Sequence, residues 1–433
     1  MSAQSKAAAA LLLGTAALAL ASCKETGGRK AGEATCDSAS THFCSSMVKL
    51  PAGYQGPRFV LSQDYPKTAP ADSMPWQSFD PMTQPDGYAN AVLGYFYEGN
   101  LRDAMATSFQ PTLNTVRDWY HAPWLDIGSN GREPIHGLTR ERASMPLELD
   151  GKQHQIWNNW AVGFYNAPGG VMFGKIWADH GKPDAAMAIA PEGTVTSKLL
   201  FTTAPLNEVP WLSGAPEWDA YIFTDLHNRG NIPPEAPRAI QKVRLLQIDF
   251  AVKDKRSSAT GWVFATFVYN GGPTGSAGSG WQHVKPVGVM WGNDPNYTGS
   301  GPLEQSWINP EVALPHLGYQ GRLNGPVDNP KSSCLSCHMT AQSPESVADL
   351  VTNLFPPTPP APADIHRWFA NLPSGQPFTP GKVSNDYSMQ VAFGLANFAG
   401  VDTALHHPDP AVRKAAAIAN LKANSAPSRA GPQ

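Results

Sequence analysis

The clearest alternation of hydrophobic and polar positions in the chain lies between residues 246 and 252. Apolar residues there alternate with polar or small ones: Leu246, Ile248, Phe250 and Val252 against Gln247, Asp249 and Ala251. A period of two residues is typical of a β-strand that is buried on one face only. Residues 261–269 form the next apolar segment, after a charged turn at 253–256. We therefore expect these two strands to pair antiparallel.

Further strands and helices are predicted on both sides of this pair. Strands are expected at residues 155–165, 171–177, 195–202 and 281–291. The first two should form a hairpin, because the connector at 166–170 is rich in Gly, Asn and Pro. Helices are expected at residues 88–105, 343–354, 364–372, 385–398 and 409–423, with Ser343 as the cap of the second. The pattern predicts an α+β fold with an antiparallel β-sheet, flanking helices and long irregular segments.

Composition narrows the classes of function more than it narrows the fold. The chain has 433 residues, of which 42% are hydrophobic, and it carries 41 Pro, 39 Gly and a formal net charge of -3. The many Pro and Gly residues favour turns and irregular connections. Because no excess of basic residues is present, no nucleic-acid partner is expected.

Residues 1–22 have the features of a targeting segment. Lys6 supplies the positive start, and residues 7–20 supply an apolar core that is too short to span a bilayer as a helix. The sequence at 20–23 resembles the lipobox of bacterial lipoproteins, which makes Cys23 a candidate for acylation and for a lipid anchor in the membrane. We expect a periplasmic, lipid-anchored protein, and Lys24 hints at the outer membrane. An ordinary signal peptide cleaved nearby is the alternative.

Four regions are expected after this signal peptide. Residues 23–50 should form an anchor and linker, in which Cys36 and Cys44 are expected to pair as a disulfide in an oxidising compartment. The other three regions are an irregular and helical part at 51–150, a β-rich domain at 151–345, and a Pro-rich linker with C-terminal helices at 346–433.

A group of aromatic and basic residues lies between positions 119 and 142. Its members are Trp119, Tyr120, His121, Trp124, Arg132, His136, Arg140 and Arg142. Such a group is compatible with the wall of a cofactor pocket. An aromatic core beside solvated arginines is the more common arrangement.

The strongest chemical signal is a C-x-x-C-H motif formed by Cys334, Cys337 and His338. Two thiols at this spacing can each bond one vinyl group of a haem, while the following imidazole becomes the proximal iron ligand. The motif therefore predicts one covalent haem c in a haem-binding sheet domain. A zinc site would need a second pair of ligands at similar spacing, and a dithiol redox motif would leave His338 unexplained.

Three landmarks precede this motif in a fixed order: residues 192–198, 251–254 and 261–264. They comprise a G-T-x-x-x-K strand, a V-K-D turn and a G-W strand. Their order resembles that of the β-sheet haem c proteins that include cytochrome c prime beta and its hydroxylamine-oxidising relatives. The resemblance covers roughly residues 155–345, and this chain carries long extra segments on both sides.

The resemblance implies roles for particular residues. Lys198 stands where that family has a lysine that is cross-linked to the haem in some members and unlinked in others, and we expect no cross-link here. The family's five-coordinate iron would bind small ligands such as nitric oxide on its open face. No distal acid or base of the kind an oxidising enzyme needs is identifiable from the sequence. Lys198 could equally be a solvated residue on the outer face of its strand.

A six-coordinate electron carrier is the alternative, and Met389 is then the best candidate for the sixth iron ligand. Met389 lies in an apolar segment, where a core methionine is the more common interpretation. His366, His406 and His407 are further candidates, although histidines at surfaces or helix ends are commoner than ligands.

These observations predict an exported redox protein that binds haem c and exchanges electrons with a partner protein in the periplasm. One alternative is an open-iron haem protein that binds or converts small ligands such as nitrogen oxides or peroxide. Another is a structural or binding lipoprotein. The sequence leaves open whether the protein is an enzyme.

Overall fold

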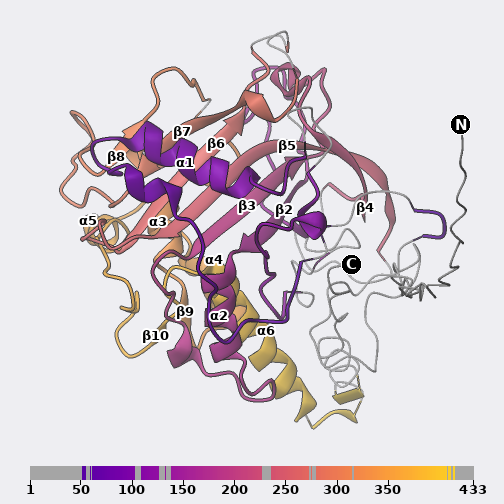
Figure 1. Ribbon diagram of the computed structural model, residues 1–433, viewed down its shortest axis with the longest axis vertical. Helices are drawn as coiled ribbons and strands as arrows, with labels where there is room; N and C mark the ends of the chain where they lie inside the picture. The colour runs from indigo at the N-terminus through magenta and orange to yellow at the C-terminus, as the bar shows by residue number, and fades with distance from the viewer. Residues whose placement is uncertain are drawn as a thin grey trace, which may run out of the picture. The chain divides into compact units, whose positions relative to one another are not determined.

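The computed structural model is shown in Figure 1. It describes residues 51–54, 59, 61–102, 109–125, 132, 138–226, 236–272, 275, 279–314, 316–406, 408–410 and 413–414. The expected signal peptide, Cys23, Cys36 and Cys44 lie outside the described residues, as do His136 and His407.

An antiparallel sheet of eight strands forms the centre of the fold. Its strands are β1 (Leu138–Arg140), β2 (Asn159–Tyr165), β3 (Val195–Thr202), β4 (Glu217–Phe223), β5 (Arg238–Lys253), β6 (Trp262–Tyr269), β7 (Val284–Met290) and β8 (Ser306–Ile308). The order is β1-β2-β3-β5-β6-β7-β8, and β4 also pairs with β5. The expected α+β class, the strand at 195–202 and the antiparallel pairing of β5 with β6 are confirmed.

Both faces of this sheet are buried, which corrects the expectation that residues 246–252 are buried on one face. In β6, alternate residues belong to two different cores: Val263, Ala265, Phe267 and Tyr269 to the first, and Trp262, Phe264 and Val268 to the second. In β5, the polar Gln247 has no exposed surface. Elements on both sides of the sheet cover it, so the polar positions of β5 face a second interior and not bulk water.

Helix α1 (Pro85–Tyr97) covers the first face and lies across β6 and β7 (Figure 1). The Phe96 ring packs edge-on against Phe164 of β2 at 5.3 Å and Phe250 of β5 at 5.5 Å between ring centroids. This helix ends earlier than the expected position 105. Gly99 adopts a positive φ of 75°, a left-handed conformation that stops helices and suits glycine.

Five helices and a small sheet belong to the chain's other segments. They are α2 (Ala167–Ile176), α3 (Cys334–His338), α4 (Val347–Asn353), α5 (Pro362–Trp368) and α6 (Met389–Leu405), with β9 (Gln342–Ser343) paired to β10 (Val383–Ser384). Met172 of α2, Leu335 of α3 and Val391 of α6 all enter the second core. Short 3-10 turns complete the described elements: η1 (Pro75–Ser78), η2 (Pro111–Leu113), η3 (Ala185–Met187), η4 (Pro210–Leu212), η5 (Trp281–His283) and η6 (Tyr319–Gly321).

The expected hairpin between 155–165 and 171–177 is wrong, because residues 167–176 form helix α2. The Asn166 side chain accepts a hydrogen bond from the backbone N–H of Gly169, and Pro168 occupies the first turn. An Asn cap followed by Pro favours a helix start, and both residues also suit a turn. The strand partners of β2 are β1 and β3 instead.

Several predicted boundaries also move. The expected strand at 281–291 begins as η5 and becomes β7 at Val284. Helix α4 is capped by Ser346 and not by Ser343, which pairs in β9. The expected helices at 364–372 and 385–398 correspond to α5 and α6, and most of the helix expected at 409–423 lies outside the described residues. Within the part of the chain that is described, no helix is long and apolar enough to cross a membrane.

Candidate functional site

Three neighbouring strands line a cavity of about 600 Å³ on the second face of the sheet. Alternate residues of a strand point to the same face, and the strands contribute Thr196 and Lys198 (β3), Asp249 and Ala251 (β5), and Phe264 and Thr266 (β6). The volume lies within the roughly 300–1,000 Å³ range of ligand and cofactor sites. The three sequence landmarks therefore fall on adjacent strands around one cavity.

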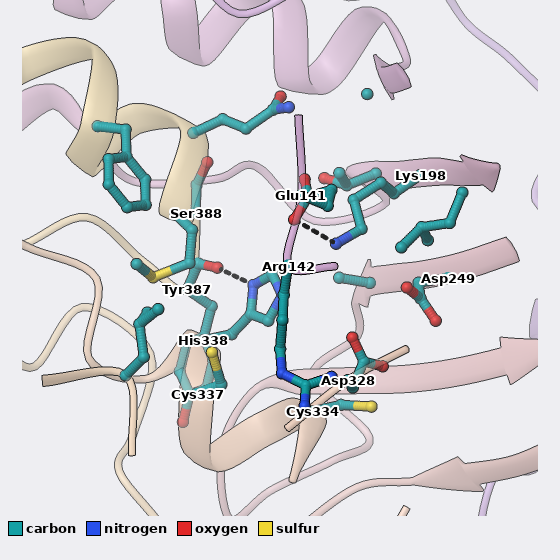
Figure 2. A pocket seen from close by; sticks show the side chains of 18 of the residues that line it. Glu141, Arg142, Lys198, Asp249, Asp328, Cys334, Cys337, His338, Tyr387 and Ser388 are labelled. Atoms are coloured by element: carbon teal, nitrogen blue, oxygen red, sulfur yellow. Dashed lines mark hydrogen bonds and ion pairs between the residues drawn. The ribbon is translucent and has the colours of Figure 1, made fainter. Parts of the chain in front are cut away.

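Helix α3 brings the three residues of the C-x-x-C-H motif to the same cavity. Ser333 caps the helix by accepting from the backbone N–H of Ser336, and the Ser336 side chain bonds back to the cap. Cys334, Cys337 and His338 all line the cavity (Figure 2). Both thiols are free, so both remain available for a covalent bond to a cofactor.

The imidazole of His338 has the hydrogen bond that metal-binding histidines usually make. Its Nδ1 lies 2.9 Å from the backbone carbonyl oxygen of Tyr387. Because a carbonyl only accepts, Nδ1 carries the proton and Nε2 keeps its lone pair for a metal. Burial lowers the pKa of His338 to about 4, so the imidazole is neutral at physiological pH. The Phe264 ring lies 5.0 Å away between centroids and restricts the imidazole on one side.

The backbone that presents this carbonyl is strained. Asp386 and Tyr387 are consecutive non-glycine residues with positive φ angles of 45° and 66°. Such left-handed conformations cost roughly 1–2 kcal/mol per residue. The Tyr387 hydroxyl donates to the carbonyl of Leu372, and its ring packs near Trp262 at 6.1 Å. These contacts offset the strain and hold the segment in place.

Lys198 lies in the cavity wall and not on a solvated outer face. Its Nζ is 3.9 Å from Glu141 Oε2 (Figure 2). Burial lowers the pKa of Lys198, but the carboxylates of Glu141, Asp249 and Asp328 together raise it above its ordinary value. Lys198 is therefore an ammonium ion. The pKa of Glu141 is raised by burial, and the Lys198 charge offsets this in part.

A pair of aspartates occupies the same wall, and sequence reasoning did not identify it as acid or base. The amide Nε2 of Gln247 donates to both oxygens of Asp249, at 2.9 and 2.8 Å, and to Asp328 Oδ2 at 2.9 Å. The Thr266 hydroxyl also donates to Asp249. Burial and the neighbouring Asp328 raise the pKa of Asp249 to about 7. Asp249 is thus a candidate proton carrier beside the motif.

The close approach of this amide depends on a glycine. A Cβ atom on Gly325 would lie 2.1 Å from the Gln247 amide, closer than any tolerated contact. Glycine at this position lets the amide reach both aspartates. Neither Gly325 nor Asp328 stands in a motif, so the sequence carried no local signal for them.

The aromatic and basic group at 119–142 divides between core and cavity. Arg140 and Arg142 line the cavity, whereas Trp119 and Tyr120 lie in the two cores. The Arg142 guanidinium pairs with the carboxylate of Glu148 and lies beside the cavity in Figure 2.

The sixth-ligand candidates differ in position. Met389, the first residue of α6, lines the cavity. It lies two residues after Tyr387, and two residues span at most about 7 Å. His366 and His406 are exposed and are not among the residues that line the cavity.

The residues that line the cavity are suited to a haem, both in their apolar side chains and in the groups that could attach it. Val347, Val351 and Leu354 of the α4 segment line it, and Val351 is 44% exposed although it is apolar. Asn158 Nδ2 also lies in this wall, buried and without a hydrogen-bond partner among the described residues. Two thiols and a neutral imidazole are the donors that haem c attachment needs. Among the described residues, no group of three or more His, Cys, Asp or Glu side chains is placed to hold a bare metal ion.

Comparison of the chain with protein-family models, curated proteins and solved structures found no match.

Proposed function

We propose that this chain is an exported redox protein that carries one covalent haem c and exchanges electrons with a partner protein in the periplasm. One observation carries the proposal: the Nδ1 of His338 is bonded to a carbonyl, while the thiols of Cys334 and Cys337 line the same cavity. This arrangement leaves Nε2 free to bind iron. The haem, when bound, supplies one-electron chemistry.

The chain's own residues would hold the haem and control its surroundings. The thiols would attach it, and His338 would be its proximal ligand. Strands β3, β5 and β6 would exclude water from one side, and the apolar α4 segment would cover another. Burial of this kind raises the influence of nearby charges on the iron, because the local dielectric constant is low.

A second candidate function is the binding or conversion of small ligands, such as nitrogen oxides or peroxide, at an open iron. The lining of the cavity favours this function, because it includes the ionisable side chains of Lys198, Glu141, Asp249 and Asp328. Ionisable residues in a buried cleft are costly and gather where proton transfer or charge stabilisation is needed.

The proposal is tested on the full-length protein made with the cytochrome c maturation machinery. Haem that stays with the denatured polypeptide after acid extraction is covalent. We expect it in the wild type and not in the double variant Cys334→Ala/Cys337→Ala. The variant Cys36→Ser/Cys44→Ser serves as control and should keep its haem. Covalent haem in the Cys334/Cys337 variant, or none in the wild type, would refute the proposal.

Visible spectra of the same samples separate the two functions. A reduced spectrum that does not change with carbon monoxide means two protein ligands and supports electron transfer alone. A spectrum that shifts with carbon monoxide means an open iron and supports small-ligand chemistry.

A further inference from the structure

A buried carboxylate, Asp386, joins four segments of the chain next to the candidate haem site. Its Oδ2 accepts from Lys253 Nζ at 2.8 Å and from the backbone N–H of Ala190 at 2.9 Å. Its Oδ1 accepts from Trp262 Nε1 at 3.1 Å and from the Ser374 hydroxyl at 2.7 Å. The Asp386 carboxylate therefore accepts four hydrogen bonds, and these hold the side chain in one position.

The ammonium group of Lys253, which pairs with Asp386, is also shielded from water. The side chain of Lys253 is 12% exposed, and that of Asp386 is 0% exposed. Lys253 is the last residue of β5, and its ammonium group contacts the Ser374 hydroxyl and lies 5.1 Å from the centre of the Trp262 ring. Breaking a buried pair by removing one partner leaves the other charge uncompensated. The surrounding segment therefore depends on both partners.

This ion pair lies immediately before the carbonyl that the proximal histidine uses. Asp386 and Tyr387 both have left-handed backbone conformations, which need support from their surroundings. The Tyr387 carbonyl accepts from His338 Nδ1 at 2.9 Å. Neither Asp386 nor Lys253 lines the cavity, so neither is placed to touch the haem.

We propose that the Lys253–Asp386 ion pair is a positioning device that holds the Tyr387 carbonyl against His338 and thereby sets the redox potential of the haem. The inference rests on the proposed haem site and goes beyond it. A carbonyl acceptor at Nδ1 makes the imidazole a stronger electron donor to iron. Stronger donation favours the oxidised iron, so loss of the acceptor raises the midpoint potential.

The test compares two variants that break the pair from opposite sides, Asp386→Asn and Lys253→Met. If the pair acts through the carbonyl, both variants raise the potential. If it acts only as a set of charges, removing the carboxylate raises the potential and removing the ammonium lowers it. The signs of the two shifts therefore separate positioning from simple electrostatics.

We expect an increase of about tenfold in the ratio of reduced to oxidised haem at a fixed applied potential, by analogy with the lower end of the roughly 10–100-fold effect that loss of such a partner has on metal affinity. For a one-electron couple, this equals about 59 mV. The resonance Raman frequency of the iron–histidine stretch should fall in both variants, because the imidazole donates less strongly. Redox titration of the purified holoproteins measures the first effect.

Asp254→Asn is the matched control. Asp254 is also buried, lies next to Lys253 and pairs with Arg256 at 2.6 Å. Among the described residues, no hydrogen bond or ion pair joins its side chain to Asp386 or Tyr387. Its variant should lose stability and keep the wild-type potential and Raman frequency. Ser374→Ala removes a single donor to Asp386 and provides a milder change should either main variant fail to fold.

Each outcome bears on a different claim. Rises in potential in both main variants, or in Ser374→Ala, with an unchanged control support the inference. Opposite shifts, or wild-type potentials in variants that carry haem, overturn it and leave the haem proposal intact. A wild type without covalent haem overturns both.

Discussion

The Nδ1 atom of His338 and the carbonyl oxygen of Tyr387 lie 2.9 Å apart, although 49 residues separate them in the sequence. The proximal side of the candidate haem site is therefore completed by the segment before α6, well beyond the β-rich region. Lys198 and Glu141 complete the cavity from the opposite direction along the chain. The candidate site is therefore built from segments that lie far apart in the sequence.

Met389→Leu tests whether Met389 is an iron ligand. Met389 follows Tyr387 by two residues, and the Tyr387 carbonyl is bonded to Nδ1 of His338, the ring nitrogen that would not bind iron. Met389 is therefore tied to the segment that holds the His338 side of the cavity, which makes it a poor candidate for a ligand opposite His338. We expect wild type and variant to respond to carbon monoxide in the same way, because leucine keeps the apolar volume and no iron ligand is lost. A wild type insensitive to carbon monoxide, together with a sensitive variant, would instead identify Met389 as the sixth ligand.

Lys198 should remain unlinked to the haem. A protonated amine has no free electron pair for attack on a porphyrin carbon, and nearby carboxylates raise the pKa of Lys198. Peptide mapping by mass spectrometry should recover the Lys198 segment free of haem, and haem only on the peptide with Cys334 and Cys337. Lys198→Met should give the same haem peptide. A haem peptide that also contains the Lys198 segment would contradict this prediction.

Strand positions in this fold were predictable where the alternation was regular, as in β3, β5 and β6. The pattern could not tell which polar positions face water and which face a cavity. Asp249 and Lys198 stand at polar positions of their strands, which would look the same in the sequence if they faced water. Only the elements packed over the second face of the sheet place them in a cavity.

Other features had no local signal at all. Asp328 and Glu141 reach the site through long-range packing, and the Tyr387 carbonyl is a backbone group that no motif marks.

The wrong prediction of a strand at residues 171–177 has a different cause. Asn and Pro at 166–168 suit both a turn and a helix start, and tertiary contacts decided between them.

Cys23→Ser tests the membrane anchor, which lies outside the described residues. A diacylated cysteine would hold the protein in the detergent phase after phase separation. We expect wild type to partition into detergent and the variant to move to the aqueous phase. Cys36→Ser should partition as the wild type does. A Cys23→Ser protein that stays in the detergent phase would remove the lipid-anchor prediction.

Asp249 should make stability depend on pH near neutrality. Its pKa is about 7 in the folded protein, because of burial and the neighbouring Asp328, against about 3.9 in an unfolded chain. A raised pKa means that the protonated form is favoured by folding. The stabilising contribution is complete below the unfolded pKa and is lost as the pH rises through the folded pKa.

We therefore expect Asp249→Asn, which cannot ionise, to gain stability relative to the wild type as the pH rises from about 4 to about 8. Each unit by which the pKa is raised corresponds to about 1.4 kcal/mol of unfolding free energy. Urea titrations of both holoproteins at several pH values measure the difference. Asp86→Asn, on an exposed position of α1, should show no such trend. A difference between Asp249→Asn and wild type that stays constant with pH would show that Asp249 is ionised throughout, and Asp249 could not then carry a proton at neutral pH.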